Sequence, residues 1–288
     1  MTPYVLLIPF LLIMFMIFAG GLLQAVVQSL GYLPAFGMGD ITLDHYRRVL
    51  TDFRFLSSLR YTFYIALTSS VLSVILGTLT AFVVHKTGRG NKISFSLLRM
   101  PVLIPHLVVV IMIFHIFFQT GIISRFAYHL GPAESAHDFP LLIYDRRGAG
   151  IMLVYLYKQI PFVALMVFAI LRNLDRKYTQ IAENLGAGPL RILTRVTLPL
   201  LAPTILSAFL ITFAFAFGAF EVPYLLGSPA RSTLPILTFI DYRSPVLADR
   251  PAAMALSVII SALSLMMIWL YARALSFFAR RGMEGGLR

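Results

Sequence analysis

The sequence predicts an all-α membrane protein with about six transmembrane helices, and two observations lead to this fold class. Of the 288 residues, 59% are hydrophobic and only 12% are charged, whereas a soluble domain carries about 25% charged residues. The apolar residues gather in long runs without charge, and a helix needs about 20 such residues to cross a bilayer. Independently of the fold, the chain has no cysteine, which excludes disulfides and thiolate sites.

The first charge-free run extends from Met1 to Gly39. It lacks a basic n-region and is far longer than the apolar part of a signal peptide, so we expect it to stay as a membrane anchor. Four further runs carry no charge, and a sixth is interrupted only by Lys158. Together the runs predict helices near residues 5–29, 58–84, 100–122, 149–172, 200–226 and 251–275.

With six spans, both termini share one side of the membrane. We expect this side to be cytoplasmic, together with segments 85–99 and 172–199, although Lys and Arg residues favour it only slightly. The net charge of +12 does not indicate nucleic-acid binding, because the basic residues are scattered at helix ends instead of forming a stripe with interleaved aromatics.

The segment ITLDHYRRVLTDFRFLSSLR, residues 41–60, precedes the second predicted span. Leu43, Tyr46, Val49 and Leu50 recur at helical spacing with charges between them. This pattern is typical of an amphipathic helix at the membrane interface. We therefore expect the segment to lie flat before the second span, within a single membrane domain that has no internal repeat.

The loop YTQIAENLGAGPLRILTRVTLPLLAP, residues 178–203, is too polar to span and too regularly patterned for a random loop. Ile181, Leu185 and Leu190 can face one way, while Gly186 and Gly188 interrupt the helix. Pro189 suits the first turn of a new helix. The pattern predicts a short helix, a bend and another helix, which either dock on a partner or merely connect two spans.

This loop resembles the EAA loop of the type-I permeases of binding-protein-dependent ABC importers. The family pattern is E-A-A, three residues, Gly, nine residues and Ile-x-Leu-Pro. Its spacing is matched here throughout, by Gln180, Ile181, Ala182, Gly186, Val196, Thr197, Leu198 and Pro199. The chain departs from the pattern at Gln180, Ile181 and Val196, so the resemblance does not extend to a salt bridge from the usual acid, although Gln can still hydrogen-bond.

In that family the loop forms the coupling helix between the fourth and fifth spans, which fits into a cleft of a cytosolic ATP-binding subunit. The resemblance, which covers about Phe55 to Phe278, implies a domain layout of 1–54 (first span and external amphipathic segment), 55–278 (transmembrane domain) and 279–288 (cytoplasmic tail). The residues implied to contact the ATPase are Gln180, Ile181, Ala182, Glu183, Leu185, Gly186, Ala187, Gly188 and Pro189, and those at the motif end are Val196, Leu198 and Pro199.

The resemblance also implies a set of partners in the bacterial cytoplasmic (inner) membrane. These are a second permease subunit of different sequence, two ATP-binding subunits, an external solute-binding protein and the lipid bilayer. The chain itself lacks a Walker phosphate loop, since the nearest string is GRGNK at residues 88–92. We therefore expect no cofactor in this chain, with ATP and Mg bound by the partner ATPase.

Neither a metal site nor an enzymatic centre is predicted. His106 and His115 lie nine residues apart, and neither has a His, Cys or acid three or four residues away to share a metal. No nucleophile motif such as G-x-S-x-G occurs.

Two ionisable residues lie inside predicted spans, Lys158 in the fourth and Glu221 in the fifth. Such residues usually face a bundle interior or an aqueous cavity, because lipid exposure is costly. From the outer helix ends, Lys158 is about 12 Å deep and Glu221 about 9 Å deep at ~1.5 Å per residue. They either pair with each other, contact the companion permease, or contact solute in the translocation pathway.

The string FGAFEVPYLLG, residues 217–227, resembles the fifth span of permeases in the polyamine, phosphonate and iron branch of the family. Phe217, Phe220 and Tyr224 are therefore further pathway candidates, with simple helix packing as the alternative. The solute is expected to be a polyamine, a phosphonate or another small polar compound. The rival functions are a stand-alone channel or secondary transporter, which would not need the docking loop, and a membrane scaffold; the EAA-like spacing disfavours both.

Overall fold

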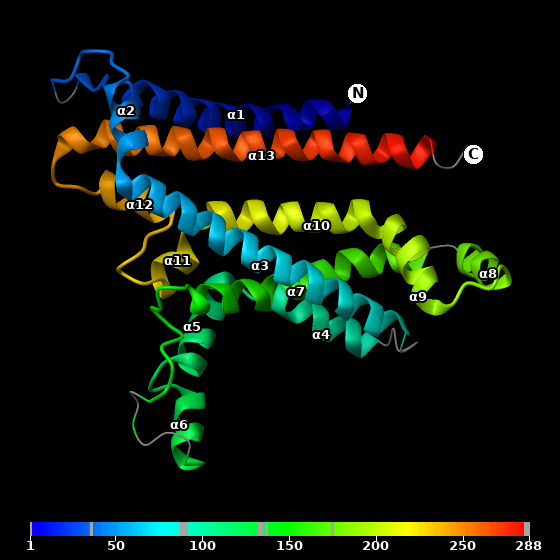
Figure 1. The fold of residues 1–288 in the computed structure, drawn as a ribbon. Helices are drawn as coiled ribbons and strands as arrows, with labels where there is room; N and C mark the ends of the chain where they lie inside the picture. The colour runs from blue at the N-terminus through cyan, green and yellow to red at the C-terminus, as the bar shows by residue number, and fades with distance from the viewer. Residues whose placement is uncertain are drawn as a thin grey trace. The chain divides into compact units, whose positions relative to one another are not determined.

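The computed structural model describes the backbone of residues 2–34, 37–86, 92–131, 135, 138–173 and 176–284. Within these ranges every regular element is helical, apart from an isolated bridge between Leu33 and Met38. The helices (Figure 1) are α1 (Thr2–Ser29), α2 (Asp44–Thr51), α3 (Phe53–Lys86), α4 (Lys92–Leu103), α5 (His106–Phe117), α6 (Ile122–His129), α7 (Ala149–Asn173), α8 (Arg176–Asn184), α9 (Pro189–Ile192), α10 (Leu198–Gly218), α11 (Glu221–Leu226), α12 (Leu234–Tyr242) and α13 (Arg250–Glu284), with a π-helical turn at Leu193–Thr197 and a 3-10 turn at Leu247–Asp249.

Six helical stretches in the described part of the chain are long and apolar enough to cross a membrane, which confirms the predicted fold class. They are Leu7–Ser29, Phe53–Lys86, His106–His129, Ala149–Asn173, Pro189–Gly218 and Leu247–Arg273. The end of the tail predicted for 279–288, residues 285–288, lies outside the described residues.

The third and fifth predicted spans are each interrupted, and a proline explains both interruptions. The prediction of one helix over 100–122 is wrong because α4 ends at Leu103 and α5 begins at His106; Pro105 disfavours a helical Ile104 before it. The prediction of one helix over 200–226 is wrong because α10 ends at Gly218. The ring of Pro223 would clash with the carbonyl of Ala219 in a continuous helix, and Ala219 is extended.

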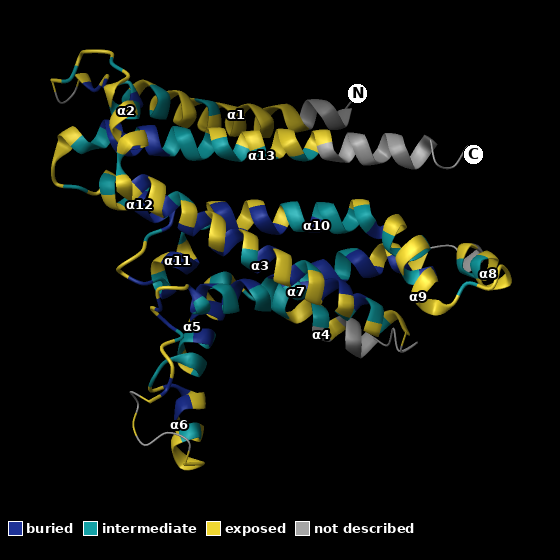
Figure 2. Ribbon diagram, viewed as in Figure 1, coloured by how far each residue is buried: buried dark blue, intermediate teal, exposed yellow. Residues whose placement is uncertain are grey.

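The chain divides into two compact units, and the first comprises Met1–Tyr61 and Ser232–Met266. In this unit the end of α1 is fixed to α2 by a hydrogen bond of 2.6 Å between the hydroxyls of Ser29 and Tyr46. The apolar side chains of α1 from Leu7 to Phe18 are exposed in the isolated chain (Figure 2), and none of the most apolar stretch within Leu7–Ser29 is buried. Such a surface suits contact with lipid.

The amphipathic segment 41–60 is not one flat helix, so that expectation is corrected. The structure ends α2 at Thr51 and starts α3 at Phe53. Asp52 causes the break: its backbone is extended, and its carboxylate accepts a hydrogen bond of 2.7 Å from the backbone N–H of Arg54. A capping carboxylate of this kind begins a helix, so residues 53–60 belong to α3.

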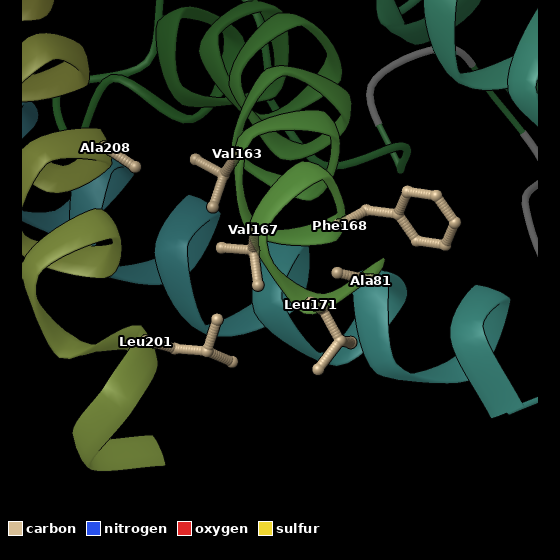
Figure 3. Close-up of a cluster of buried hydrophobic side chains, with 7 residues drawn as sticks. All are labelled: Ala81, Val163, Val167, Phe168, Leu171, Leu201 and Ala208. Atoms are coloured by element: carbon tan, nitrogen blue, oxygen red, sulfur yellow. The ribbon is translucent and has the colours of Figure 1, made fainter. Parts of the chain in front are cut away.

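The second unit comprises Thr62–Arg231 and Met267–Arg288, and α7 is its central helix. This helix packs against α4, α5, α10 and α11, and buried residues recur along it from Gly150 to Leu171 (Figure 2). A core cluster links it to α3 and α10 (Figure 3), and its members are Ala81, Val163, Val167, Phe168, Leu171, Leu201 and Ala208.

Candidate functional site

A cavity of about 190 Å³ lies in the second unit among α4, α5, α7 and α10. Its lining residues are Val102, His106, Tyr155, Lys158, Gln159, Phe162, Ile211, Thr212 and Phe215. Most of these side chains are apolar or aromatic, and a few are polar, which is the usual composition of a ligand site.

Lys158, on α7, reaches the break between α4 and α5. Its Nζ donates hydrogen bonds to the carbonyl oxygens of Val102, at 3.0 Å, and Ile104, at 2.5 Å. In a continuous helix these carbonyls would accept from residues four positions later, but the break at Pro105 removes those partners. The ammonium group therefore caps the C-terminal end of α4, where a cation also interacts favourably with the helix dipole.

His106, the first residue of α5, lies on the same cavity. Its ring stacks on Phe215 of α10, with 4.9 Å between ring centroids and 28° between planes. Lys158 and Glu221 are both close enough to His106 for their charges to interact electrostatically with its ring. Among the ion pairs of the described residues, however, none joins Lys158 to Glu221; Glu221 is exposed at the start of α11.

Gln159 holds three helices together beside the cavity and is only 5% exposed. Its amide oxygen accepts a hydrogen bond of 3.0 Å from the hydroxyl of Ser73 on α3. Its amide nitrogen donates to the backbone carbonyl of Thr212 on α10, at 3.3 Å. The polar groups at this level of the bundle are thus fixed in place.

The aromatic pathway candidates occupy two different environments. Phe217 is 1% exposed and packs edge-on against Phe63 of α3, with ring centroids 5.2 Å apart. Phe220 and Tyr224 stack on each other at 5.0 Å, and Tyr224 is exposed. None of the three lines the cavity, and their place on a pathway stays a prediction.

The loop between α7 and α10 contains two short helices joined by a left-handed turn. Gly186 has φ of +77°, a conformation that only glycine adopts without strain. The Gly186 N–H bonds to the carbonyl of Glu183 at 2.9 Å, and the Ala187 N–H bonds to that of Ala182 at 2.9 Å. These two bonds form the Schellman motif that terminates α8; α9 then begins at Pro189, after an extended Gly188.

The outer surface of α8, together with Leu185 directly after its end, carries exposed apolar side chains. Tyr178, Ile181 and Leu185 are spaced by three and four residues and therefore share one face; all three are exposed, Leu185 to 82%. Gln180 and Glu183 are exposed beside them. Of the motif-end residues, Val196 lies in the π-helical turn, while Leu198 and Pro199 begin α10.

Several cavity-lining residues were not singled out from the sequence, among them Gln159, Thr212 and Phe215. A signal was present in part, since a Lys-Gln pair is unusual in an apolar span and Pro105 predicts a helix break with unpaired carbonyls. Among the described residues, no three His, Asp or Glu side chains gather as they would around a metal ion.

Residues 73–276 match the family described as binding-protein-dependent transport system inner membrane component. The chain is 27% identical over 205 residues to the putrescine transport system permease protein PotI of Escherichia coli (strain K12); the match covers 70% of this chain and 66% of PotI, just under two thirds of its length. It is 25% identical over 245 residues to the putative 2-aminoethylphosphonate transport system permease protein PhnU of Salmonella typhi, covering 83% and 81% of the two chains.

The fold is similar to that of a chain in a bacterial ABC transporter involved in the import of the acidic polysaccharide alginate. The TM-score is 0.73 at 17% identity, and the superposition covers 96% of this chain and 95% of that one. This likeness concerns the fold, while the family match spans most of the sequence. The chain therefore belongs to the family of binding-protein-dependent transport system inner membrane components.

Proposed function

We propose that this chain is a permease subunit of a bacterial ATP-binding-cassette importer, in which it forms half of the solute translocation pathway. Membership of the family supports this function. One structural observation carries the coupling part of the proposal: Tyr178 and Ile181 of α8, and Leu185 directly after its end, are exposed apolar residues on one face. An exposed apolar stripe on a short helix fits a groove on a partner protein.

In this proposal, α8 and α9 are the coupling helix, and residues 180–189 contact a cytosolic ATP-binding subunit. The Schellman turn at Gly186 fixes the angle between the two short helices. The π-helical turn after α9 leads directly into α10, so a displacement of the loop is transmitted to a helix that lines the cavity.

The assembly that follows contains this chain, a second permease of different sequence, two ATP-binding subunits and an external solute-binding protein. ATP and Mg are bound and ATP is hydrolysed in the ATP-binding subunits, while this chain has no enzymatic role. The solute is a small polar compound, for which polyamines and phosphonates are the first candidates because PotI and PhnU are named for transport of such compounds.

The experiment compares two equally exposed leucines in the purified assembly. Leu185→Asp places a charge on the proposed docking face, whereas Leu130→Asp changes a leucine of similar exposure, 80% against 82%, at the end of α6. We expect Leu185→Asp to lower both the amount of ATPase that co-purifies and the transport per ATP hydrolysed, because burying an uncompensated carboxylate is costly. Equal behaviour of the two variants would contradict the coupling role of α8.

The proposal also places both termini and α8 in the cytoplasm, and α2 outside. Because the chain has no cysteine, single cysteines at Leu185 and Leu43 report their sides without background. In intact cells an impermeant thiol reagent should label Leu43→Cys and not Leu185→Cys, and disruption of the membrane should make both reactive. Labelling only at position 185 in intact cells would reverse the orientation.

A further inference from the structure

We propose that the cavity beside Lys158 binds an anionic group of the transported solute, so that this subunit selects a small anion over a cation. The inference rests on the proposed function, since it assigns a ligand class to the pathway of a permease. It goes beyond that function because neither the family nor the relatives decide the charge of the solute.

The charge of the cavity wall is the first argument. Lys158 is the only fully charged side chain among the lining residues, and none of the lining residues that the structure describes is acidic. The two hydrogen bonds of its ammonium group go to neutral backbone carbonyls. The dipole of α4 offsets about half a charge at most, so the groups that line the cavity keep a net positive charge.

The second argument is the set of donors that face the same space. The Lys158 ammonium group has three N–H donors, and two are used on Val102 and Ile104. The Gln159 amide has two N–H donors, of which one is used on Thr212. The remaining donors are held rigidly by α7, and charge-assisted bonds from such donors to an anion are about twice as strong as neutral ones.

Size and surroundings limit the ligand further. The cavity volume of about 190 Å³ is smaller than the roughly 300 to 1,000 Å³ of sites that hold drug-sized ligands. This space suits a phosphonate, a carboxylate or a tetrahedral oxyanion with a short substituent. The aromatic side chains of Tyr155, Phe162 and Phe215 make the rest of the wall weakly polar, which strengthens the attraction between Lys158 and an anion.

A dication such as putrescine is the opposite case. It would require carboxylates on the cavity wall, and Glu221, whose charge reaches His106, does not line the cavity. Lys158 would repel the ligand at close range. The structure therefore separates two ligand classes that the relatives PotI and PhnU leave open.

The test measures the thermal unfolding midpoint of the whole transporter complex in lipid nanodiscs, without the external binding protein. Methylphosphonate and putrescine are the probes, compared with potassium chloride at equal ionic strength. Methylphosphonate should raise the midpoint of the wild-type complex in a saturable way, and putrescine should not. A shift with putrescine alone, or with neither probe, overturns the inference.

Two variants locate the effect. Lys158→Arg keeps the charge and should retain binding, whereas Lys158→Gln should weaken methylphosphonate binding at least tenfold, as expected for loss of a charge-assisted hydrogen bond. Since Lys158→Gln also uncaps α4, a second variant avoids that change: Gln159→Glu adds an acid to the wall and should abolish the methylphosphonate shift. Unchanged methylphosphonate affinity in both Lys158→Gln and Gln159→Glu would contradict the assignment.

The same preparations separate this inference from the proposed function. If the ATP-binding subunits co-purify and hydrolyse ATP, but putrescine binds and methylphosphonate does not, only the anion inference fails. If no ATP-binding subunit associates with the wild-type chain, the proposed function itself fails.

Discussion

The turn at Gly186 offers a prediction whose magnitude follows from backbone geometry alone. The residue has φ of +77°, and a Cβ added there would meet no atom within 4 Å. Gly186→Ala therefore introduces no clash, and its whole effect is the cost of a left-handed L-residue, about 1 to 2 kcal/mol. This cost falls on the Schellman turn that ends α8 and sets the course of the chain into α9.

Hydrogen exchange of the amides of Gly186 and Ala187, which donate the two bonds of the turn, measures this cost. An energy of 1 to 2 kcal/mol corresponds to about 5- to 30-fold faster exchange. Gly188→Ala is the matched control, because Gly188 has φ of −69° and also lies in open space. Gly186→Asn should recover part of the protection, since Asn tolerates this conformation. Equal exchange in the two alanine variants would refute the reasoning.

Two further predictions concern packing and pH. Gly77→Ala should cost about 1 to 3 kcal/mol of stability and lower the unfolding midpoint, because the added Cβ would lie 2.6 Å from the Cβ of Val163. Gly218→Ala is the control: its added Cβ meets open space, so the midpoint should stay nearly unchanged. Equal midpoints of the two variants would contradict the tight contact of α3 with α7. Burial of Asp52 opposes ionisation, but its hydrogen bonds from Arg54 outweigh burial and lower the pKa of Asp52. Asp52→Asn should therefore lower the unfolding midpoint relative to the wild-type chain at pH 7. The difference between the two midpoints should shrink as pH falls below about 4, because the wild-type carboxylate then becomes protonated. A difference that does not depend on pH would contradict this.

The sequence determined the helical fold well because hydropathy is summed over long windows. Charge-free runs located the six spans without reference to tertiary contacts. The same averaging concealed the helix breaks, since Pro105 and Pro223 lie inside apolar runs and barely change their hydropathy. The end of α2 was missed for another reason: it depends on one capping carboxylate, Asp52, whose effect is local.

The two parts of the candidate site differ in how far the sequence predicts them. In the α8–α9 loop the conformation depends on residues that are adjacent in the sequence, so Gly186 and Pro189 could be singled out in advance. The structure has the left-handed turn at Gly186 and the start of α9 at Pro189. The partners of Lys158 lie 54 and 56 positions away in the sequence. They are backbone carbonyls, which carry no residue-specific pattern, and only the packed bundle identifies them.

The central claim is that this permease meets its ATP-binding subunit through the exposed face of α8. The most direct measurement places the photoreactive residue p-benzoylphenylalanine at Leu185 in the assembled transporter, with Leu130 as the equally exposed control, and identifies the cross-linked product by mass spectrometry. The account predicts an adduct with the ATP-binding subunit from position 185 and none from position 130. An assembled transporter in which position 185 yields no such adduct, or in which position 130 yields it equally, would contradict the account.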